Sequence, residues 1–408
     1  MTSTERRRSL AFLALSATQL MVILDGTVVT VALPAIRSGL GFSDSSLSWV
    51  VNAFFIAFAV VLLPAGRLGD RWGTRRVFLT GVALFTAASI LCGLAWDPAS
   101  LLVGRALQGV GGGLSTAVSL GMIAELFPEP ARRMRAFAVL AFIGSAGGAI
   151  GMVAGGMITE FAAWPWVFLV NVPIGAASLA LGAATLERVP GRPVSGGLVP
   201  AALLRTRRFS LAGGVLFTMV IAGMSFQFLS SLFLQDTLGL SPLSTGAAFL
   251  AVTVPIAITS LGLSVRLAAR FGAERVLVAA LAFFAAGMVL MARVPDDGTF
   301  WLDVAPAFVV MGAGFGLAMP QVTDLAMTAS PPEHAGAASA FLAATQQAGG
   351  AVGVFAAGSL AAAAGPGIGY FLGAGALVVG IGLTVFLERS TSHRLNREPV
   401  EQAVIGSR

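Results

Sequence analysis

Long apolar runs, each about as long as a membrane crossing, recur along the whole chain. A spanning helix needs roughly 20 mainly apolar residues, because each residue adds about 1.5 Å and the hydrocarbon core is about 30 Å thick. By this measure the sequence predicts twelve spans: Leu10–Leu33, Ser48–Ala65, Val77–Ala95, Leu101–Glu125, Ala136–Ile158, Trp166–Leu186, Leu211–Leu234, Gly246–Ala268, Val276–Met291, Val304–Ala329, Ala335–Ala363 and Tyr370–Leu387. With 56% hydrophobic and 11% charged residues, we expect an all-α membrane protein.

The distribution of arginine predicts how these spans are oriented. All 25 basic residues are Arg, and 22 of them lie in the termini and loops that share one face of the membrane. The loops of the other face hold only Arg37 and Arg293, and Arg105 lies inside a span. Because basic residues concentrate on the cytoplasmic side, we expect a multi-pass protein of the cytoplasmic (inner) membrane with both termini in the cytoplasm.

One polar stretch, Gly66–Arg76, follows the second predicted span and returns later in the chain. Its glycines predict a tight turn and its arginines suit a cytoplasmic surface. When Gly66–Phe85 is aligned with Val265–Phe284, 199 residues later, eight positions are identical, so we expect two related halves. The predicted domains are an N-terminal six-helix bundle (1–186), a cytoplasmic linker rich in Pro, Gly and Arg (187–210), a C-terminal six-helix bundle (211–387) and a cytoplasmic tail (388–408).

Missing residue types exclude several kinds of site. A P-loop and a Schiff-base enzyme both need Lys, and the sequence has none. One cysteine, Cys92, and two histidines, His334 and His393, exclude a disulfide framework and a His/Cys metal cluster. No paired acids or nucleophile–base set converge within the spans, so we expect no enzyme, no metal and no cofactor. The basic charge follows from the loop arginines, and we expect no nucleic-acid partner.

Four segments together resemble the major facilitator superfamily, and within it the drug:proton antiporters that usually have fourteen spans. Gly66–Arg76 is similar to the superfamily's signature after the second span, and Leu24–Pro34 to the multidrug branch's signature in the first. Leu102–Gly109 resembles the fourth-span signature, and Gly147–Gly156 the antiporter signature of the fifth. The resemblance implies a major facilitator fold of twelve transmembrane helices in two pseudo-symmetric six-helix bundles. We also expect the chain to be a monomer in the lipid bilayer.

The sequence departs from this family pattern at two places that bear on function. Met152 stands where the antiporter signature carries Pro. The fourteen-span branch has two additional spans between its halves, whereas this chain has only the linker there, so we expect that pair to be deleted. The remaining twelve spans are the superfamily's minimum and are expected to fold.

Polar and charged side chains inside the spans are the candidate site residues, because a charge at a span centre costs roughly 2.5–3.5 kcal/mol on insertion scales. Asp25 and Arg105 are predicted to lie at overlapping depths, with Asn52 and Gln108 in the same layer. Either Asp25 binds a proton or a cationic substrate, with Arg105 adjusting or relaying that proton, or the two form a structural ion pair. The resemblance favours the functional interpretation. Asp324 is a weaker candidate, since an acid near a helix end is as readily explained by solvation.

Other residues take candidate roles as cavity lining or from the resemblance. Glutamines inside the spans either line a substrate cavity or bond neighbouring helices: Gln227, Gln321, Gln346 and Gln347. The superfamily's inner-side lock between the bundles maps onto Gly66, Asp70, Arg71, Gly73 and Arg76, although the arginines are equally explained by topology. The antiporter signature maps onto Gly147, Gly151, Gly155 and Gly156.

These expectations combine into one functional hypothesis. We expect a secondary transporter that exports amphiphilic or cationic drugs or antibiotics in exchange for protons by alternating access, with proton and cargo competing at Asp25. No Walker motif is present, so the energy would come from the proton gradient, about 2.3 kcal/mol per charge at 100 mV. The alternatives are a proton-coupled uptake carrier or uniporter of the same fold, and a non-transporting membrane protein.

Overall fold

The computed structural model describes residues 3–187, 203, 205–330 and 335–395, and every regular element in those ranges is a helix. The α-helices are α1 Ser3–Leu40, α2 Asp44–Leu47, α3 Trp49–Trp72, α4 Thr74–Gly93, α5 Pro98–Leu126, α6 Pro130–Phe161, α7 Trp166–Leu169, α8 Asn171–Thr185, α10 Arg207–Leu232, α11 Pro242–Ala248, α12 Leu250–Ile258, α13 Ser264–Phe271, α14 Ala273–Met291, α15 Ala305–Thr328, α16 Ala335–Ala364 and α17 Pro366–Leu395. Three π-helical turns, η1 Phe233–Thr237, η2 Thr259–Leu263 and η3 Phe300–Val304, join or extend them. Twelve stretches of these helices are long and apolar enough to cross a membrane, which confirms the predicted number of spans.

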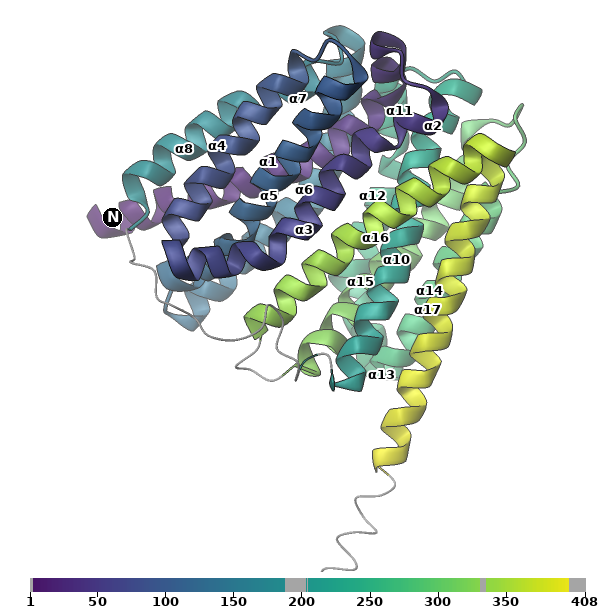
Figure 1. The fold of residues 1–408 in the computed structure, drawn as a ribbon. Helices are drawn as coiled ribbons and strands as arrows, with labels where there is room; N and C mark the ends of the chain where they lie inside the picture. The colour runs from purple at the N-terminus through teal and green to yellow at the C-terminus, as the bar shows by residue number, and fades with distance from the viewer. Residues whose placement is uncertain (1–2, 188–202, 204, 331–334, 396–408) are drawn as a thin grey trace, which may run out of the picture.

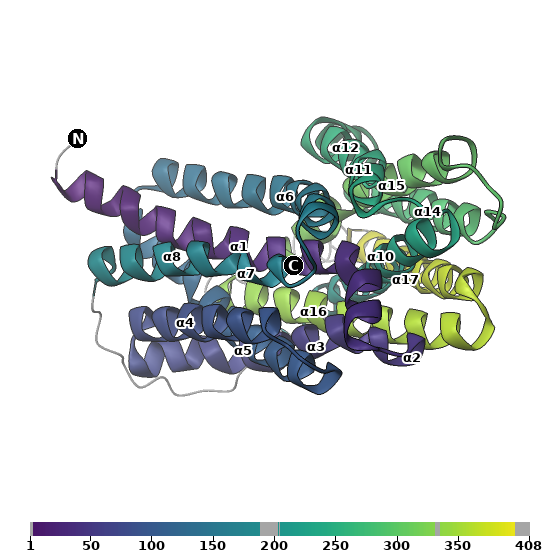
Figure 2. The ribbon, with the colours of Figure 1, turned by 90° about the horizontal axis from the view of Figure 1, so that it is seen from above.

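The helices form two bundles that lie side by side (Figure 1), and the view turned by 90° shows the same division (Figure 2). In the first bundle α1 packs on α6 and α8, and α5 packs on α3 and α4. In the second, α10 packs on α16 and α17, and α15 packs on α12 and α14. Between the bundles, α3 packs on α16 and α6 on α11. The predicted all-α fold of two six-helix bundles is therefore confirmed.

The internal repeat is visible in the conformation of two glycines. Gly73 separates α3 from α4 with φ +91°, and Gly272, 199 residues later, separates α13 from α14 with φ +89°. Glycine adopts such angles without the steric cost that a β-carbon brings. Each half of the molecule therefore uses the same one-residue break between two consecutive spans.

The tight turn predicted within Gly66–Arg76 consists of a single residue. α3 continues to Trp72 and α4 begins at Thr74, so Gly73 alone makes the turn. The Gly73 amide donates to the Gly69 carbonyl oxygen at 2.9 Å, which completes the end of α3. A polar sequence at a membrane surface can remain helical because its backbone groups pair within the helix while water solvates its side chains. The predicted tight turn is therefore present, whereas the predicted ends of the flanking spans, at Ala65 and Val77, were wrong because both lie inside helices.

The two ends of the molecule differ in charge and in how the bundles meet. We call the end with the α3–α4 turn and the starts of α6 and α10 the basic face, and the end with the α1–α2 turn and the start of α11 the opposite face. At the opposite face, polar contacts join the bundles: Arg37–Asp236 at 2.8 Å, Gln235 to the Val31 carbonyl at 2.9 Å, and the Leu243 amide to Glu160 at 3.0 Å. Toward the middle, the Ser231 hydroxyl donates to the Thr30 carbonyl at 2.8 Å. The bundles are thus held together at the opposite face.

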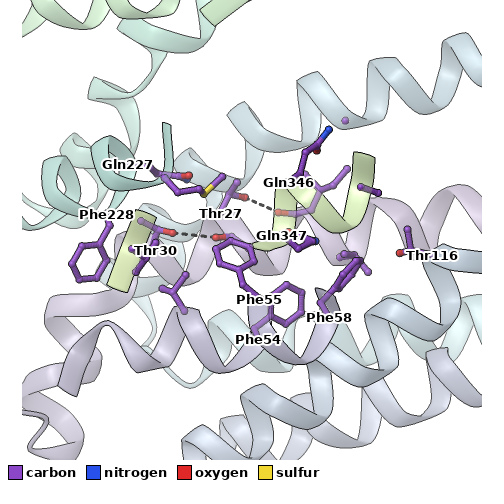
Figure 3. A pocket seen from close by; sticks show the side chains of 18 of the residues that line it. Thr27, Thr30, Phe54, Phe55, Phe58, Thr116, Gln227, Phe228, Gln346 and Gln347 are labelled. Carbon is purple, nitrogen blue, oxygen red and sulfur yellow. Dashed lines mark hydrogen bonds between the residues drawn. The ribbon is translucent and has the colours of Figure 1, made fainter. Parts of the chain in front are cut away.

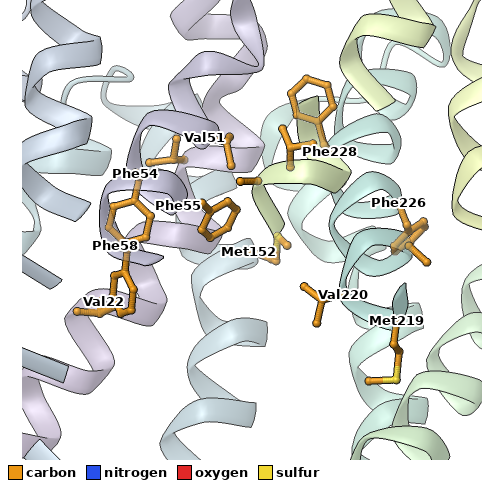
Figure 4. Close-up of a cluster of buried hydrophobic side chains, with 14 of the residues drawn as sticks. Val22, Val51, Phe54, Phe55, Phe58, Met152, Met219, Val220, Phe226 and Phe228 are labelled. Carbon is orange, nitrogen blue, oxygen red and sulfur yellow. The ribbon is translucent and has the colours of Figure 1, made fainter. Parts of the chain in front are cut away.

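Buried apolar side chains from both bundles belong to one continuous cluster. Phe54 and Phe55 of α3 and Val220 and Phe228 of α10 are among them, as Figure 4 shows. Apolar burial alone does not drive helices together in lipid, so close packing of such surfaces has to hold them. This cluster forms much of the wall around the cavity described below.

Candidate functional site

Asp25 lies in the middle of α1 and is completely buried inside the first bundle. One carboxylate oxygen accepts from the Arg105 guanidinium, and the other accepts from the amides of Gln108 and Asn171, each at 2.9 Å. Asp25 is the only carboxylate among the buried side chains of the described residues. A buried charge is tolerated when it is paired and hydrogen-bonded, and Asp25 meets both conditions.

Arg105 reaches Asp25 from α5, the helix that begins with a capping box at Asp97. Its Nε donates to the Val50 carbonyl oxygen at 2.8 Å, and one terminal nitrogen also donates to Gln108 at 2.9 Å. Its guanidinium lies 4.7 Å from the centre of the Phe54 ring, within range of a cation–π contact. Arg105 therefore ties α1, α3 and α5 together around one ion pair.

Gln108 extends this network to α4. Its amide nitrogen donates to the Ser89 hydroxyl at 2.8 Å, and its oxygen lies 3.4 Å from the Cys92 sulfur. Four helices of the first bundle and the start of α8, at Asn171, thus share one buried polar network. The structure brings together Asp25, Arg105 and Gln108 as the sequence predicted.

Two other predicted site residues do not join the network. Asn52 is fully buried on α3, but neither its amide nitrogen nor its oxygen has a partner among the described residues. Asp324 is exposed near the C-terminal end of α15. Asn171 and Ser89 were not proposed as site residues, because nothing in the sequence shows that their side chains face this network.

A cavity of about 500 Å³ lies between the bundles and is lined by residues of both. The lining comes from α1, α3, α5 and α6 on one side and from α10, α15 and α16 on the other. Figure 3 shows Phe54, Phe55 and Phe58 of α3 along one wall, with Gln347 of α16 beside them. Its volume is in the usual range for drug-sized ligands, roughly 300–1,000 Å³.

Three of the four glutamines proposed from the sequence line this cavity: Gln227, Gln346 and Gln347. The fourth, Gln321, instead donates to the Ser264 hydroxyl of α13 at 2.7 Å, which is a bond between helices. Gln19 of α1 also lines the cavity. The sequence analysis missed Gln19, because only the structure shows which face of α1 is turned toward the second bundle.

α1 separates the cavity from the buried network. Gly26 and Thr27 line the cavity. Asp25 directly precedes them on α1, but its side chain points into the first bundle and does not line the cavity. The expected competition of proton and cargo at Asp25 is therefore not a direct contact in this conformation. Phe54 lines the cavity and also contacts Arg105, so its ring is a physical link between the two.

The glycines of the fifth-span signature set how closely α6 packs. At Gly151 and Gly155 an added β-carbon would collide with Thr27 and Val28 of α1. At Gly156 it would collide with the Pro242 carbonyl oxygen of α11, in the other bundle. At Gly147 the crowding is milder, because an added β-carbon would lie 3.2 Å from the Leu20 side chain of α1. The signature thus joins α6 both to the helix of Asp25 and to the second bundle.

The predicted lock residues lie at the basic face. Asp70, Arg71 and Arg76 are exposed, and Asp70 forms no salt bridge with any described residue. Gly66 is helical, and a β-carbon added to it would meet nothing within 4 Å, so neither close packing nor an unusual backbone angle requires a glycine there in this conformation. Arg75, which was not assigned to the lock, donates to the Ala183 carbonyl oxygen of α8 at 2.7 Å.

Comparisons with known proteins agree with this architecture. The sequence profile described as "Major Facilitator Superfamily" matches residues 15–354 and 211–406. The chain is 35% identical to the puromycin resistance protein pur8 of Streptomyces alboniger, over 85% of this chain and 80% of that protein. It is 34% identical to the cephamycin export protein CmcT of Amycolatopsis lactamdurans, over 82% of this chain and 81% of that protein.

A further relative and a solved structure extend the comparison. The methylenomycin A resistance protein of Bacillus subtilis is 31% identical, over 82% of this chain and 84% of that protein. The crystal structure of a mutant of the nucleoside transporter NupG superposes with a TM-score of 0.74, covering 93% of this chain and 99% of that chain at 13% sequence identity. At that identity the likeness shows the fold alone.

Proposed function

The chain belongs to the Major Facilitator Superfamily, and we propose that it exports an amphiphilic small molecule across the cytoplasmic membrane in exchange for protons. The family and the twelve spans show that the chain is a multi-pass membrane transporter. The direction and the cargo class are proposed because several relatives carry names of antibiotic resistance or export proteins.

The observation that carries the proposal is the cavity between the bundles. It presents an aromatic wall and several amide and hydroxyl groups to the same space, and such a mixture suits a molecule with both apolar and polar parts. Both bundles contribute to its lining. A movement of one bundle against the other would therefore change the access to a bound molecule from one face to the other.

We assign proton coupling to the network of Asp25, Arg105 and Gln108. Asp25 is the buried carboxylate of the described spans, and ionisable groups inside membrane helices commonly serve proton pathways. α1 carries Asp25 on one face and cavity-lining residues on the other, so a displacement of α1 on proton binding would reach the cargo. Phe54 offers a second route between Arg105 and the cavity.

Alternating access is supported by the way in which the bundles meet. In this conformation the opposite face is closed by contacts such as Arg37–Asp236. We propose that the basic face is cytoplasmic, that this conformation is closed toward the outside, and that opening requires these contacts to separate. The lock around Asp70 would then act in the other conformation, when the bundles approach at the basic face.

Transport by purified protein in lipid vesicles tests the proposal. Vesicles with a trapped pH-sensitive dye should show proton movement only when a transported compound is added, and an imposed pH gradient should drive compound against its own gradient. Uptake of compound together with protons would indicate a carrier of the opposite direction. Compound movement without proton movement would indicate a uniporter. If neither compound nor protons move for any compound of a broad test panel, the proposal is wrong.

A further inference from the structure

The cavity between the bundles is lined without any charged side chain. The described residues that form it include Gln19, Gln227, Gln346 and Gln347, three threonines, and a majority of apolar side chains, with no Asp, Glu, Arg or His. A transporter that selects cations would be expected to place a carboxylate at its cargo, since a buried charge without a partner is strongly disfavoured. The polar part of this cavity is made of neutral amides and hydroxyls instead.

Several of these neutral groups have unused hydrogen-bonding capacity. The side chains of Gln19, Gln346 and Gln347 make no hydrogen bond with any described residue, and Gln227 has only the Met152 sulfur, at 3.7 Å. The buried Thr116 hydroxyl at the cavity wall also has no partner in the part of the chain that the structure describes. Each Gln amide offers two donors and an acceptor with two lone pairs, so a bound molecule can satisfy them with carbonyl, amide or hydroxyl groups.

The nearest candidate countercharge is not available to a molecule in the cavity. Asp25 has no exposed surface, lies on the other side of α1, and already accepts from Arg105, Gln108 and Asn171. Together Asp25 and Arg105 form an ion pair with no net charge. A cation that entered the cavity would lose its hydration and meet only amide oxygens and ring faces in return.

We propose that this cavity binds its cargo as an electrically neutral molecule with a flat apolar part and several amide, carbonyl or hydroxyl groups. Phe54, Phe55 and Phe58 contact the apolar part, and the glutamines of α1, α10 and α16 bind the polar groups. This inference rests on the proposed function and narrows its substrate class. It also implies that a cargo with an ionisable amine binds in its uncharged form, so that the proton is carried elsewhere.

A pair of isosteric probes tests the charge preference directly. The first is a fluorescent coumarin amide whose side chain ends in a tert-butyl group, and the second is the same molecule ending in trimethylammonium. The two have nearly the same shape and differ by one charge. Binding is measured on the purified full chain by fluorescence anisotropy, and we expect the neutral probe to bind at least tenfold more tightly than the cationic one.

Gln346→Glu and Gln347→Glu supply a reciprocal test, because each puts a carboxylate on the cavity wall with almost no change in size. We expect either variant to bind the cationic probe at least tenfold more tightly than the unchanged protein does. Gln346→Leu removes the amide and adds no charge. It should weaken binding of the neutral probe by roughly three- to tenfold, the usual effect of one lost hydrogen bond. Gel filtration and thermal unfolding identify any variant that fails to fold. If the variant at Gln346 fails to fold, the test is made at Gln347 instead.

The outcomes separate this inference from the proposed function. If the unchanged protein binds the cationic probe as tightly as the neutral one or more tightly, the inference is overturned while export can still stand. If the neutral probe binds and the glutamate variants reverse the preference, the inference is supported even if no proton movement accompanies transport. If the glutamate variants fold but leave the preference unchanged, the cargo binds elsewhere and the inference fails.

Discussion

Arg37 and Asp236 are 199 residues apart, the same offset that relates Gly73 to Gly272, and their side chains form a salt bridge of 2.8 Å between the bundles. Each residue is therefore the counterpart of the other in the internal repeat. Counterparts related by an approximate two-fold axis can touch only close to that axis. The axis therefore passes close to this salt bridge, which lies at the opposite face, where the bundles would separate if that face opened.

We expect transport to stop when positions 37 and 236 are linked covalently. In a Cys92→Ser background, Arg37→Cys with Asp236→Cys would be joined by a short bis-maleimide, and vesicle transport should fall more than tenfold because the opposite face can no longer open. The control is Arg37→Cys with Asp44→Cys, since Asp44 also bonds Arg37, at 3.0 Å, but belongs to the same bundle. Unchanged transport after linking 37 to 236 would mean that this face does not open.

A companion test of this first prediction removes the charge alone, which should have a much smaller effect on the balance between the two conformations. The side chains of Arg37 and Asp236 are about one-third exposed, and exposed ion pairs contribute about 0–1 kcal/mol. Asp236→Asn is therefore expected to change the balance between the two conformations by no more than about fivefold, measured as the labelling rate of a cysteine placed in the cavity.

The second prediction concerns the contact between α6 and α11. Gly156→Ala places a methyl group against the Pro242 carbonyl oxygen, which cannot yield without moving the helix. We expect the variant to destabilise the conformation closed at the opposite face and to lower transport severalfold, with thermal unfolding much less affected. Gly148→Ala is the matched control on the same helix, because nothing lies within 4 Å of its added methyl group. Equal effects of both substitutions would show that this crossing has no special role.

Much of the fold could be predicted because the bilayer allows few solutions. A span needs a long apolar run and internally paired backbone groups, and these two requirements are visible in the sequence without any knowledge of packing. The same reasoning misplaced the helix ends around Gly66–Arg76, where the spans were predicted to stop at Ala65 and to resume at Val77. At a membrane surface polarity and helicity are compatible, so the end of a span does not mark the end of its helix.

The site could be predicted less completely, because the sequence does not show which side chains of α1 face the cavity and which face the first bundle. The cost of a buried charge singled out Asp25 and Arg105, and the structure pairs them. No such cost marks Phe54, because an aromatic side chain in a span is unremarkable until its neighbours are known, and Gln19 was not proposed although other glutamines in the spans were. Depth along a helix can be estimated from the sequence, whereas the direction of each side chain around the helix depends on tertiary packing.

The third prediction separates the structural and the proton-coupling roles of Asp25. Asp25→Asn leaves the Arg105 guanidinium buried without its carboxylate, and breaking a buried pair costs about 3–5 kcal/mol. We therefore expect Asp25→Asn to lower the unfolding temperature. The double variant Asp25→Asn with Arg105→Gln should recover much of that loss, because it no longer buries an unpaired guanidinium. Both variants should lose gradient-driven transport, because neither retains an ionisable acid there. Proton-driven transport by the stable double variant would show that Asp25 is only structural.

The fourth prediction is the orientation of the chain. Of the 25 arginines, 22 lie at the termini or in loops that share one face, so an accessible tag inserted within 187–210 should be detected from the cytoplasm. A tag at Pro295–Thr299, between α14 and η3, should be detected from outside. Labelling intact cells and inverted vesicles with an impermeant reagent distinguishes the two sides. The reverse pattern would invert the proposed direction of access.

The last prediction is that Asp70 acts in the conformation that this structure does not show. Asp70 is exposed at the basic face and forms no salt bridge with a described residue, so Asp70→Asn should leave the stability of the present conformation within about 0.5 kcal/mol of the unchanged protein, as usual for a surface substitution. If its carboxylate pairs with an arginine or a helix N-terminus when the bundles close at the basic face, the same variant should slow transport severalfold while probe binding changes little. Arg71→Gln is the companion variant, because it removes a neighbouring charge at the same face. The two readouts, thermal unfolding and transport rate, separate the alternatives: a loss of insertion or stability with normal transport per folded molecule would mean that these residues serve topology and not the transport cycle.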